Sequence, residues 1–160
     1  MASGAQPPVS KEIRDSGLRL LAQREHSRKE LLNKLLQKGF AKDDIITVVD
    51  ELVAQGWQND QRYAESYARF RILKGYGPVR VAYELRQNGI DFFDLEQLLT
   101  ELGTTWDELI AQVYCKKYKN NSGIDRNEWA KRSRFLMQRG FSGDMISALF
   151  NQLTINKRKI

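Results

Sequence analysis

The sequence contains very few of the residues on which most enzyme chemistry depends. Among its 160 residues there is one cysteine, Cys115, and one histidine, His26. A single residue of each kind cannot form a disulfide framework, a closed zinc site or a cysteine–histidine nucleophilic pair within the chain. The short segment 75–77 (GYG) follows an expected helix instead of a strand, so it does not fit a phosphate-binding loop. We therefore expect no enzymatic activity, no metal and no cofactor.

Long hydrophobic runs are also missing. The most apolar runs, such as residues 45–49, are far too short to span a bilayer. Residues 1–10 contain two of the three prolines and lack the apolar stretch of a signal peptide, so we expect a flexible N-terminal arm. Because 41% of the residues are hydrophobic, the rest of the chain can bury a core. These features favour a soluble cytoplasmic protein without a membrane partner.

Positive charge is concentrated in the last third of the chain. The formal net charge is +6, from 26 Lys and Arg against 20 Asp and Glu. Residues 1–56 and 57–103 are nearly neutral, whereas residues 104–160 carry 11 basic and 5 acidic residues. The preceding stretch from Asp91 to Glu108 holds six acidic residues and no basic one. A polyanion would be attracted to the basic region and repelled beside it, although an ordinary solvated surface shows the same pattern.

Three glycines, Gly39, Gly89 and Gly140, lie 50 and 51 residues apart in matching contexts. Each follows a leucine by four positions and precedes an apolar residue. Each is then followed by apolar residues at i, i+3, i+4 and i+7, which is the spacing of one helix face. These sets are Ile45, Val48, Val49 and Leu52; Leu95, Leu98, Leu99 and Leu102; and Ile146, Leu149, Phe150 and Leu153. The agreement indicates a threefold internal repeat.

Start and stop signals predict a helix before each of these glycines. Ser27 and Glu30 have the spacing of a capping box, and Gly39 is expected to end that helix in the left-handed conformation. Pro78 is expected at the first helical position of the corresponding helix in the second repeat, where its missing N–H is not needed. Each repeat therefore contains at least two helices.

A further helix is predicted at the beginning of each repeat. Asp60 is expected to cap this helix in the second repeat, and Thr105 with Glu108 forms a capping-box pattern in the third. Residues 119–127 (KNNSGIDRN) are expected to form a lengthened loop. Runs with the alternation of strands are absent from the sequence, so the fold class predicted is all-α.

Three helices of this size bury little apolar surface alone, which favours stacked repeats in an elongated, curved, solenoid-like body. Such a body offers a long concave surface to another macromolecule. The expected organisation is a flexible arm at 1–10, three-helix repeats at 11–56, 57–103 and 104–155, and a basic tail at 156–160.

Basic and aromatic residues are interleaved in residues 62–86. This mixture suits single-stranded nucleic acid, because cations pair with phosphates and bases stack on aromatic faces. Tyr63, Tyr67 and Phe70, however, lie at i, i+4 and i+7 and are expected in the core. Tyr76 lies in a loop outside any helical periodicity, so we expect its ring to be available for contact and its truncation to cost little stability.

Salt bridges along helices are expected to neutralise part of this segment. Two pairs have i, i+4 spacing: Glu65 with Arg69, and Arg80 with Glu84. The cations left unpaired by this assignment are Arg71, Lys74 and Arg86.

Residues 59–67 (NDQRYAESY), 74–78 (KGYGP) and 84–90 (ELRQNGI) resemble the central signature of the RecX family. The signature combines N-D-x-x-[FY]-A with a basic helix end, then K-G-Y-G-P and E-L-x-x-x-G-[IV]. Residues 20–31 (LLAQREHSRKEL) also resemble the first repeat of the family. The resemblance covers about residues 13–153 and is weakest after Trp106.

This resemblance implies a bacterial modulator of the RecA recombinase, built from three tandem three-helix repeats. Proteins of the family are thought to lie along the helical groove of the RecA filament on single-stranded DNA. They are thought to suppress ATP hydrolysis, strand exchange and the coprotease activity that induces the DNA-damage response. The partners expected are therefore the RecA filament and, weakly and with salt sensitivity, single-stranded DNA, and the protein is expected to be a monomer.

Two sets of candidate contact residues are predicted. The filament-contact set is Arg71, Lys74, Tyr76, Arg80 and Arg86. The nucleic-acid set is Lys116, Lys117, Lys119, Lys131, Arg132, Arg134 and Arg139. Two alternatives stay open: a tandem helical DNA- or RNA-binding protein that acts without RecA, and an adaptor solenoid that binds only protein. The predicted second and third helices lack the polar exposed N-terminus of a recognition helix, which disfavours the first alternative.

Overall fold

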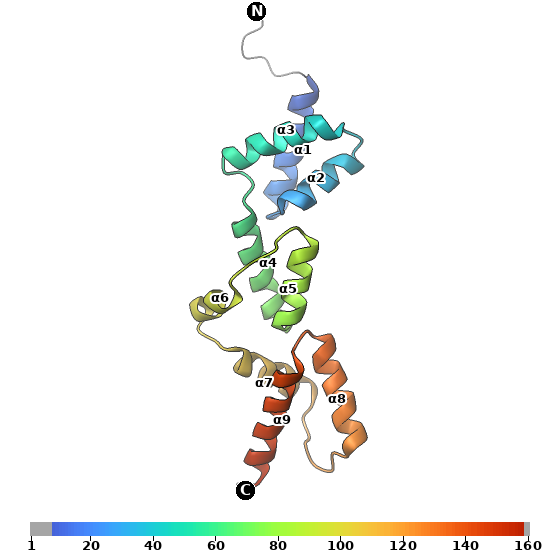
Figure 1. Cartoon of the computed structure of the whole chain (residues 1–160), viewed down its shortest axis with the longest axis vertical. Coiled ribbons are helices and arrows are strands. Elements are labelled where there is room, and N and C mark those ends of the chain that lie inside the picture. Colours follow the sequence, from blue (N-terminus) through green and yellow to red (C-terminus); the bar gives the residue numbers. More distant parts are fainter. Residues whose placement is uncertain (1–7, 159–160) are drawn as a thin grey trace, which may run out of the picture. The chain divides into compact units, whose positions relative to one another are not determined.

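The computed structural model describes the backbone of residues 8–158 and the side chains of residues 8–154. In this part of the chain every regular element is an α-helix (Figure 1). The helices are α1 (Pro8–Gln23), α2 (Arg28–Gln37), α3 (Lys42–Ala54), α4 (Asp60–Leu73), α5 (Pro78–Gln87), α6 (Leu95–Leu102), α7 (Trp106–Lys117), α8 (Arg126–Gln138) and α9 (Gly143–Arg158). The predicted all-α class with three helices per repeat is confirmed. Across residues 8–158, no helix combines the length and apolar character that a bilayer-crossing segment requires.

Helices extend into both segments that were expected to lie outside the repeats. In the arm predicted at 1–10, residues 8–10 are helical because α1 begins at Pro8; residues 1–7 lie outside the described part. The basic tail predicted at 156–160 overlaps α9, which continues to Arg158, and residues 159–160 are not described.

Local capping explains where several helices begin. The predicted capping box is present at α2: the Ser27 hydroxyl accepts from Glu30 N at 3.0 Å, and the Glu30 carboxylate accepts from Ser27 N at 3.1 Å. At α7 only half of the predicted box forms. The Thr105 hydroxyl accepts from Glu108 N at 3.2 Å, while the Glu108 carboxylate accepts from the neighbouring Thr104 hydroxyl at 3.0 Å.

The predicted N-cap of α4 is wrong by one residue. Asn59 caps the helix, because its side-chain oxygen accepts from Arg62 N at 2.8 Å. Asp60 is the first helical residue, and its carboxylate accepts instead from Arg28 N at 2.8 Å and from the Gln58 side chain at 2.9 Å. Asp60 therefore accepts a hydrogen bond from the N-terminus of α2. Capping rules consider only residues next to the helix end in sequence, so they do not predict this long-range contact.

The three repeat glycines end α2, α5 and α8 as predicted. Their φ angles are +94° at Gly39, +87° at Gly89 and +97° at Gly140, all in the left-handed region. Each helix thus stops where a residue without a Cβ permits the turn.

The chain divides into two compact units that do not coincide with the repeats. The first unit comprises Met1–Ser66 and Leu85–Asp91, and the second comprises Tyr67–Glu84 and Phe92–Ile160. The boundaries between the units therefore fall within α4 and within α5. Each unit has its own buried residues and is described separately.

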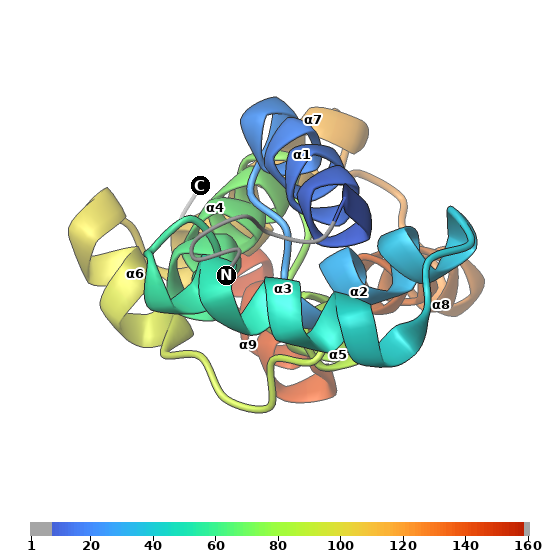
Figure 2. The ribbon, with the colours of Figure 1, turned by 90° about the horizontal axis from the view of Figure 1, so that it is seen from above.

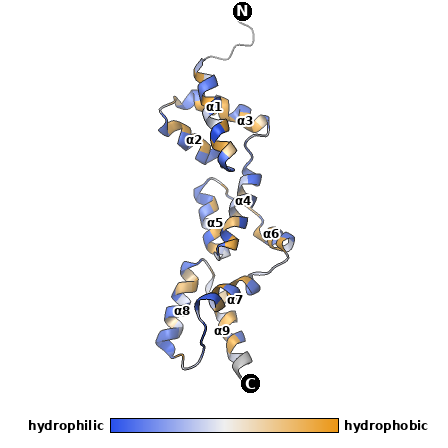
Figure 3. Cartoon of the chain, turned by 180° about the vertical axis from the view of Figure 1, so that it is seen from behind, coloured by the Kyte–Doolittle hydropathy of each residue, from blue (hydrophilic) through white to orange (hydrophobic). Residues whose placement is uncertain are grey.

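The core of the first unit lies where α3 packs against α1 and α2 (Figure 2). It contains the predicted apolar face of α3 together with residues of the two other helices: Ile13, Leu31, Leu35, Ile45, Val48, Val49 and Leu52. Apolar residues alternate with hydrophilic ones along these helices (Figure 3), so each helix has one face to bury and one face for solvent.

In the second unit α9 packs against α7 and α8. Its buried residues include Ile110, Tyr114, Leu136, Ile146 and Leu149. Trp106, at the start of α7, contacts Phe141 edge to face with 6.5 Å between ring centroids, and its indole N–H donates to Glu96 at 3.0 Å.

The predicted aromatic core of α4 is only partly correct. Tyr63 is 2% exposed and its hydroxyl accepts from Asn88 at 2.8 Å. Phe70 is 55% exposed, so its predicted burial is wrong. Ala64, Ala68 and Ile72 are buried instead, which places the inward face of α4 away from Phe70.

Candidate functional site

The loop between α4 and α5 is held against the end of α8 in the second unit. Gly77 N donates to Arg139 O at 2.7 Å, and Val79 N donates to Gly140 O at 2.9 Å. A Cβ on Gly77 would lie 2.6 Å from Gly140 O, so no larger residue fits without movement of the backbone. The loop that carries Tyr76 is thereby fixed by backbone contacts.

Tyr76 is surrounded by arginine side chains. The guanidinium carbons of Arg71, Arg80 and Arg139 lie 3.7, 4.5 and 5.0 Å from the centroid of its ring. Cation–π contacts of this kind each contribute about 0.5–1 kcal/mol at a partly exposed position. The half-buried Tyr76 ring therefore contacts three cations of its own chain, and its availability to a partner stays a prediction.

Arg71 is not the unpaired cation that the sequence predicted. Its Nε and Nη2 each donate to the Glu84 carboxylate at 3.0 Å, in a bidentate pair whose side chains are 17% and 21% exposed. Burial acts to lower the pKa of Arg71, but the hydrogen bonds and charge of Glu84 outweigh it and raise that pKa. The predicted partner of Glu84, Arg80, lies farther away, with Nε 3.9 Å from the carboxylate.

The remaining members of the filament-contact set differ in their surroundings. Arg80 Nη1 donates to Gln138 O at 2.9 Å, so its charge is held at the end of α8. Lys74 is exposed, and its ammonium lies 5.4 Å from the Phe70 ring centroid. Arg86 is exposed in the last turn of α5 and belongs to the first compact unit. The structure thus gathers Arg71, Tyr76 and Arg80 at one point, with Lys74 in the same unit.

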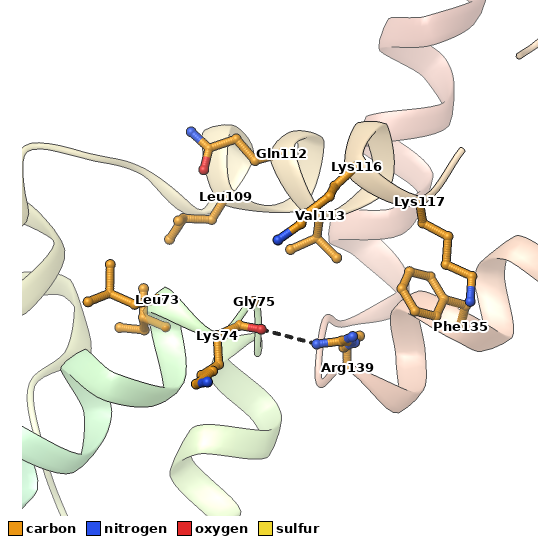
Figure 4. Close-up of a pocket in the computed structure, with 11 residues that line it drawn as sticks. Leu73, Lys74, Gly75, Leu109, Gln112, Val113, Lys116, Lys117, Phe135 and Arg139 are labelled. Carbon is orange, nitrogen blue, oxygen red and sulfur yellow. Dashed lines mark hydrogen bonds between the residues drawn. The ribbon is translucent and has the colours of Figure 1, made fainter. Parts of the chain in front are cut away.

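A pocket of about 460 Å³ opens beside this loop in the second unit (Figure 4). Its floor is apolar: Ile72, Leu73, Leu109, Val113 and Phe135. Leu109 and Val113 project from α7 toward Leu73 and Gly75 (Figure 4). We call this cavity the α4–α7 pocket.

Cations from both predicted sets line the α4–α7 pocket. They are Lys74, Lys116, Lys117 and Arg139. Arg139 Nη1 donates to Lys74 O at 3.1 Å, a bond that ties the two sets together (Figure 4). Lys117 Nζ lies 4.5 Å from the Phe135 ring centroid. The pocket therefore combines an apolar floor with four positive charges, and its lining includes no acidic residue.

Arg132 is buried and cannot be a phosphate contact as the sequence predicted. It is 8% exposed, and its guanidinium donates to Glu128, the Tyr114 hydroxyl, Asn121 and the Asn120 carbonyl at 2.7–3.1 Å. Its guanidinium carbon also lies 4.3 Å from the Tyr118 ring centroid. Arg132 thus ties Asn120 and Asn121 to α7 and α8; the lengthened loop predicted at 119–127 ends two residues earlier, because α8 begins at Arg126.

The other predicted nucleic-acid residues are exposed but outside the pocket. Lys119 follows α7, and Lys131 and Arg134 lie on α8. None of the three forms an ion pair with another described residue. The predicted set therefore separates into pocket cations, exposed cations and the buried Arg132.

The single histidine has a structural environment in the first unit. His26 is 0% exposed; Lys34 Nζ donates to its Nε2 at 2.9 Å, and its Nδ1–H donates to Arg24 O at 3.0 Å. Burial, together with the charges of Arg24 and Lys34, lowers the pKa of His26. Within the described residues no three His, Cys, Asp or Glu side chains are grouped as metal ligands would be, and Cys115 is exposed.

Sequence reasoning missed the apolar floor and the role of Glu84. Leu73 is 76% exposed, and an apolar residue off the buried face of its helix is a signal that the sequence contains. Glu84 pairs with a residue 13 positions away, and no helical spacing indicates that contact.

The chain matches three domain models of one family. They are described as RecX first three-helix domain at residues 14–52, RecX second three-helix domain at 59–99, and RecX third three-helix domain at 107–150.

Among curated proteins, it is 40% identical to the regulatory protein RecX of Pseudomonas fluorescens over 139 residues, which cover 87% of this chain and 90% of that one. It is 39% identical to the regulatory protein RecX of Legionella pneumophila (strain Corby), covering 87% and 93%. Among solved structures, it is similar to the crystal structure of RecX from Lactobacillus salivarius, with a TM-score of 0.71, 27% identity, and coverage of 92% and 97%.

Proposed function

The chain belongs to the RecX family of regulatory proteins, and from that membership we propose that it binds the RecA filament on single-stranded DNA. Binding inhibits ATP hydrolysis, strand exchange and the coprotease function of the filament. The protein acts by occupying a surface and not by catalysis. It works as a monomer in the cytoplasm, where the filament forms.

The main support for this proposal is that cations from both predicted sets line one pocket in the second unit. Lys74, from the segment that resembles the family signature, lines the same pocket as Lys116, Lys117 and Arg139 from the basic third repeat. A nucleoprotein filament presents both protein surface and phosphate. A regulator that binds it can use apolar side chains to contact the protein and cations to pair with the phosphates.

The direct test is the ATPase rate of RecA on single-stranded DNA with substoichiometric additions of this protein. We expect the steady-state rate to fall at molar ratios well below one per RecA. An unchanged rate at equimolar protein would contradict the proposal. If the protein then still binds DNA with a salt dependence, the tandem DNA- or RNA-binding alternative gains support.

A variant pair locates the contact. Lys74→Glu combined with Arg86→Glu changes two exposed cations and is expected to raise the half-inhibitory concentration at least tenfold, because reversing an interface charge adds repulsion to the lost attraction. Lys11→Glu combined with Lys42→Glu is the matched control, with the same charge change at exposed positions outside both predicted contact sets. Equal loss of inhibition in both double variants would mean that only net charge matters.

A further inference from the structure

The floor of the α4–α7 pocket is an apolar surface that the second unit leaves uncovered. Leu73, in the last turn of α4, is 76% exposed; Leu109 of α7 projects toward it, and Val113 of α7 projects toward Gly75 (Figure 4). Covering apolar surface of this kind is favourable by roughly 25 cal/mol per Å². The volume of about 460 Å³ is within the range of pockets that hold small ligands.

The charges around this floor are unbalanced. Lys74 and Lys116 form no ion pair with any residue whose side chain the structure describes. The remaining cations of the lining are engaged only in part: Lys117 lies over Phe135, and Arg139 donates to a backbone carbonyl. A ligand that supplies carboxylates would neutralise the lysines without displacing an internal salt bridge.

We infer that the α4–α7 pocket is a docking site for an acidic peptide segment of a protein partner. One large aliphatic side chain of the segment enters the floor formed by Leu73, Leu109 and Val113. Carboxylates on either side of it pair with Lys74 and Lys116. The combination of an apolar anchor with flanking charge supplies both affinity and orientation.

Single-stranded nucleic acid fits this pocket less well. Bases stack on aromatic faces, and the only ring in the lining is that of Phe135. Lys117 Nζ lies 4.5 Å and Arg139 Cζ 5.4 Å from its centroid, and the Tyr118 ring approaches at 5.8 Å. The rest of the floor is aliphatic, so an oligonucleotide would gain only phosphate contacts.

The inference rests on the proposed function in that it names the partner chemistry of the same pocket, but its test contains no recombinase. The probe is a fluorescein-labelled twelve-residue peptide of Asp, Glu and Gly with one central Leu, and binding is followed by fluorescence anisotropy. The matched probe has Ser in place of the Leu. We expect the Leu peptide to bind at least tenfold more tightly than the Ser peptide.

Protein variants separate the pocket from general charge. Lys116→Glu is expected to weaken binding of the Leu peptide at least tenfold, and Lys131→Glu, an exposed charge reversal outside the pocket, less than threefold. Leu73→Ser should remove the preference for Leu over Ser while leaving the melting temperature unchanged, because Leu73 is largely exposed. Lys74→Glu provides a second rim variant if Lys116→Glu fails to fold.

Three outcomes would overturn the inference. Equal binding of the Leu and Ser peptides would show that no apolar side chain anchors the peptide. Equal losses of affinity in Lys116→Glu and Lys131→Glu would show that binding depends only on net charge. Binding of oligo(dT) that loses tenfold with Leu73→Ser, while the peptide binds unchanged, would make the pocket a nucleic-acid site. None of these results depends on whether RecA is inhibited.

Discussion

At the scale of single residues, two arginines two positions apart in α8 have separate roles. The guanidinium of Arg132 is buried and donates to four groups, whereas Arg134 is exposed and forms no ion pair with a described residue. Residues two apart on a helix face different directions, so residue type alone cannot assign their roles.

This difference predicts opposite phenotypes for matched substitutions. Arg132→Gln is expected to lower the free energy of unfolding by about 2 kcal/mol or more, because the Tyr114 hydroxyl and Glu128 lose their shared partner. Arg134→Gln should change it by less than about 0.5 kcal/mol. Urea denaturation followed by circular dichroism measures both. Equal stability of the two variants would contradict the structural role of Arg132.

His26 predicts a pH dependence of stability in the first unit. Its pKa in the folded chain is lowered from the model-peptide value of 6.5, so the unfolded chain binds a proton first as the pH falls. This contribution to stability is complete above about pH 6.5 and is lost as the pH falls from there toward the lowered pKa.

The measurement is urea unfolding between pH 7.5 and 5.5, with His26→Asn as the reference variant. We expect the wild-type free energy of unfolding to fall over this range and that of the variant to be lower but flatter. Glu30 does not contribute to this change with pH, because its pKa is lowered from 4.5 and its carboxylate titrates below this range. Parallel curves for the two proteins would mean that another group titrates.

At the scale of elements, corresponding glycines end their helices in different surroundings. A Cβ on Gly39 would meet nothing within 4 Å, whereas one on Gly140 would overlap Arg80, with Arg80 N at 2.7 Å. Both residues have positive φ, so each substitution carries backbone strain, but only Gly140 also has no room.

Gly39→Ala is therefore expected to cost about 1 kcal/mol from the left-handed backbone alone. Gly140→Ala should cost at least about 2 kcal/mol more, because the first turn of α5, which holds Arg80, must move away from α8. Thermal and urea unfolding of the two single variants tests the difference. Equal losses of unfolding free energy in the two variants would show that the chain around Arg80 moves away from Gly140 at little cost.

The helices could be predicted because their capping and periodicity signals lie within a few residues of one another. Contacts between residues far apart in the chain could not be predicted from the sequence. The capping box of Ser27 and Glu30 lies within one turn, and the structure confirms it. Asp60, which bonds Arg28 N 32 residues away, and Arg71, which pairs with Glu84, required the folded chain. The elongated body expected from the repeat stays a prediction.

At the scale of the whole molecule, the net charge of +6 favours polyanions. With Arg132 buried, the exposed candidates for phosphate contact include Lys116, Lys119, Lys131 and Arg134. These cations are spread over α7, α8 and the loop after α7, so we expect weak direct binding of single-stranded DNA.

If about four phosphates are neutralised, log K should fall with log salt at a slope of roughly −3. Combining Lys119→Glu with Lys131→Glu should make the slope shallower by at least about 1, because each lost contact removes roughly 0.7. Anisotropy of labelled oligo(dT) at several salt concentrations measures this slope. A slope near zero in the parent protein would exclude a nucleic-acid surface.

The boundaries within α4 and α5 mean that the middle repeat of the sequence does not form one compact unit of the fold. The N-terminal half of α4 belongs to one compact unit and its C-terminal half to the other, and α5 is divided in the same way. A cut between residues 56 and 57 would therefore divide the first compact unit, and a cut between residues 103 and 104 would divide the second. Neither boundary of the middle repeat separates two complete units.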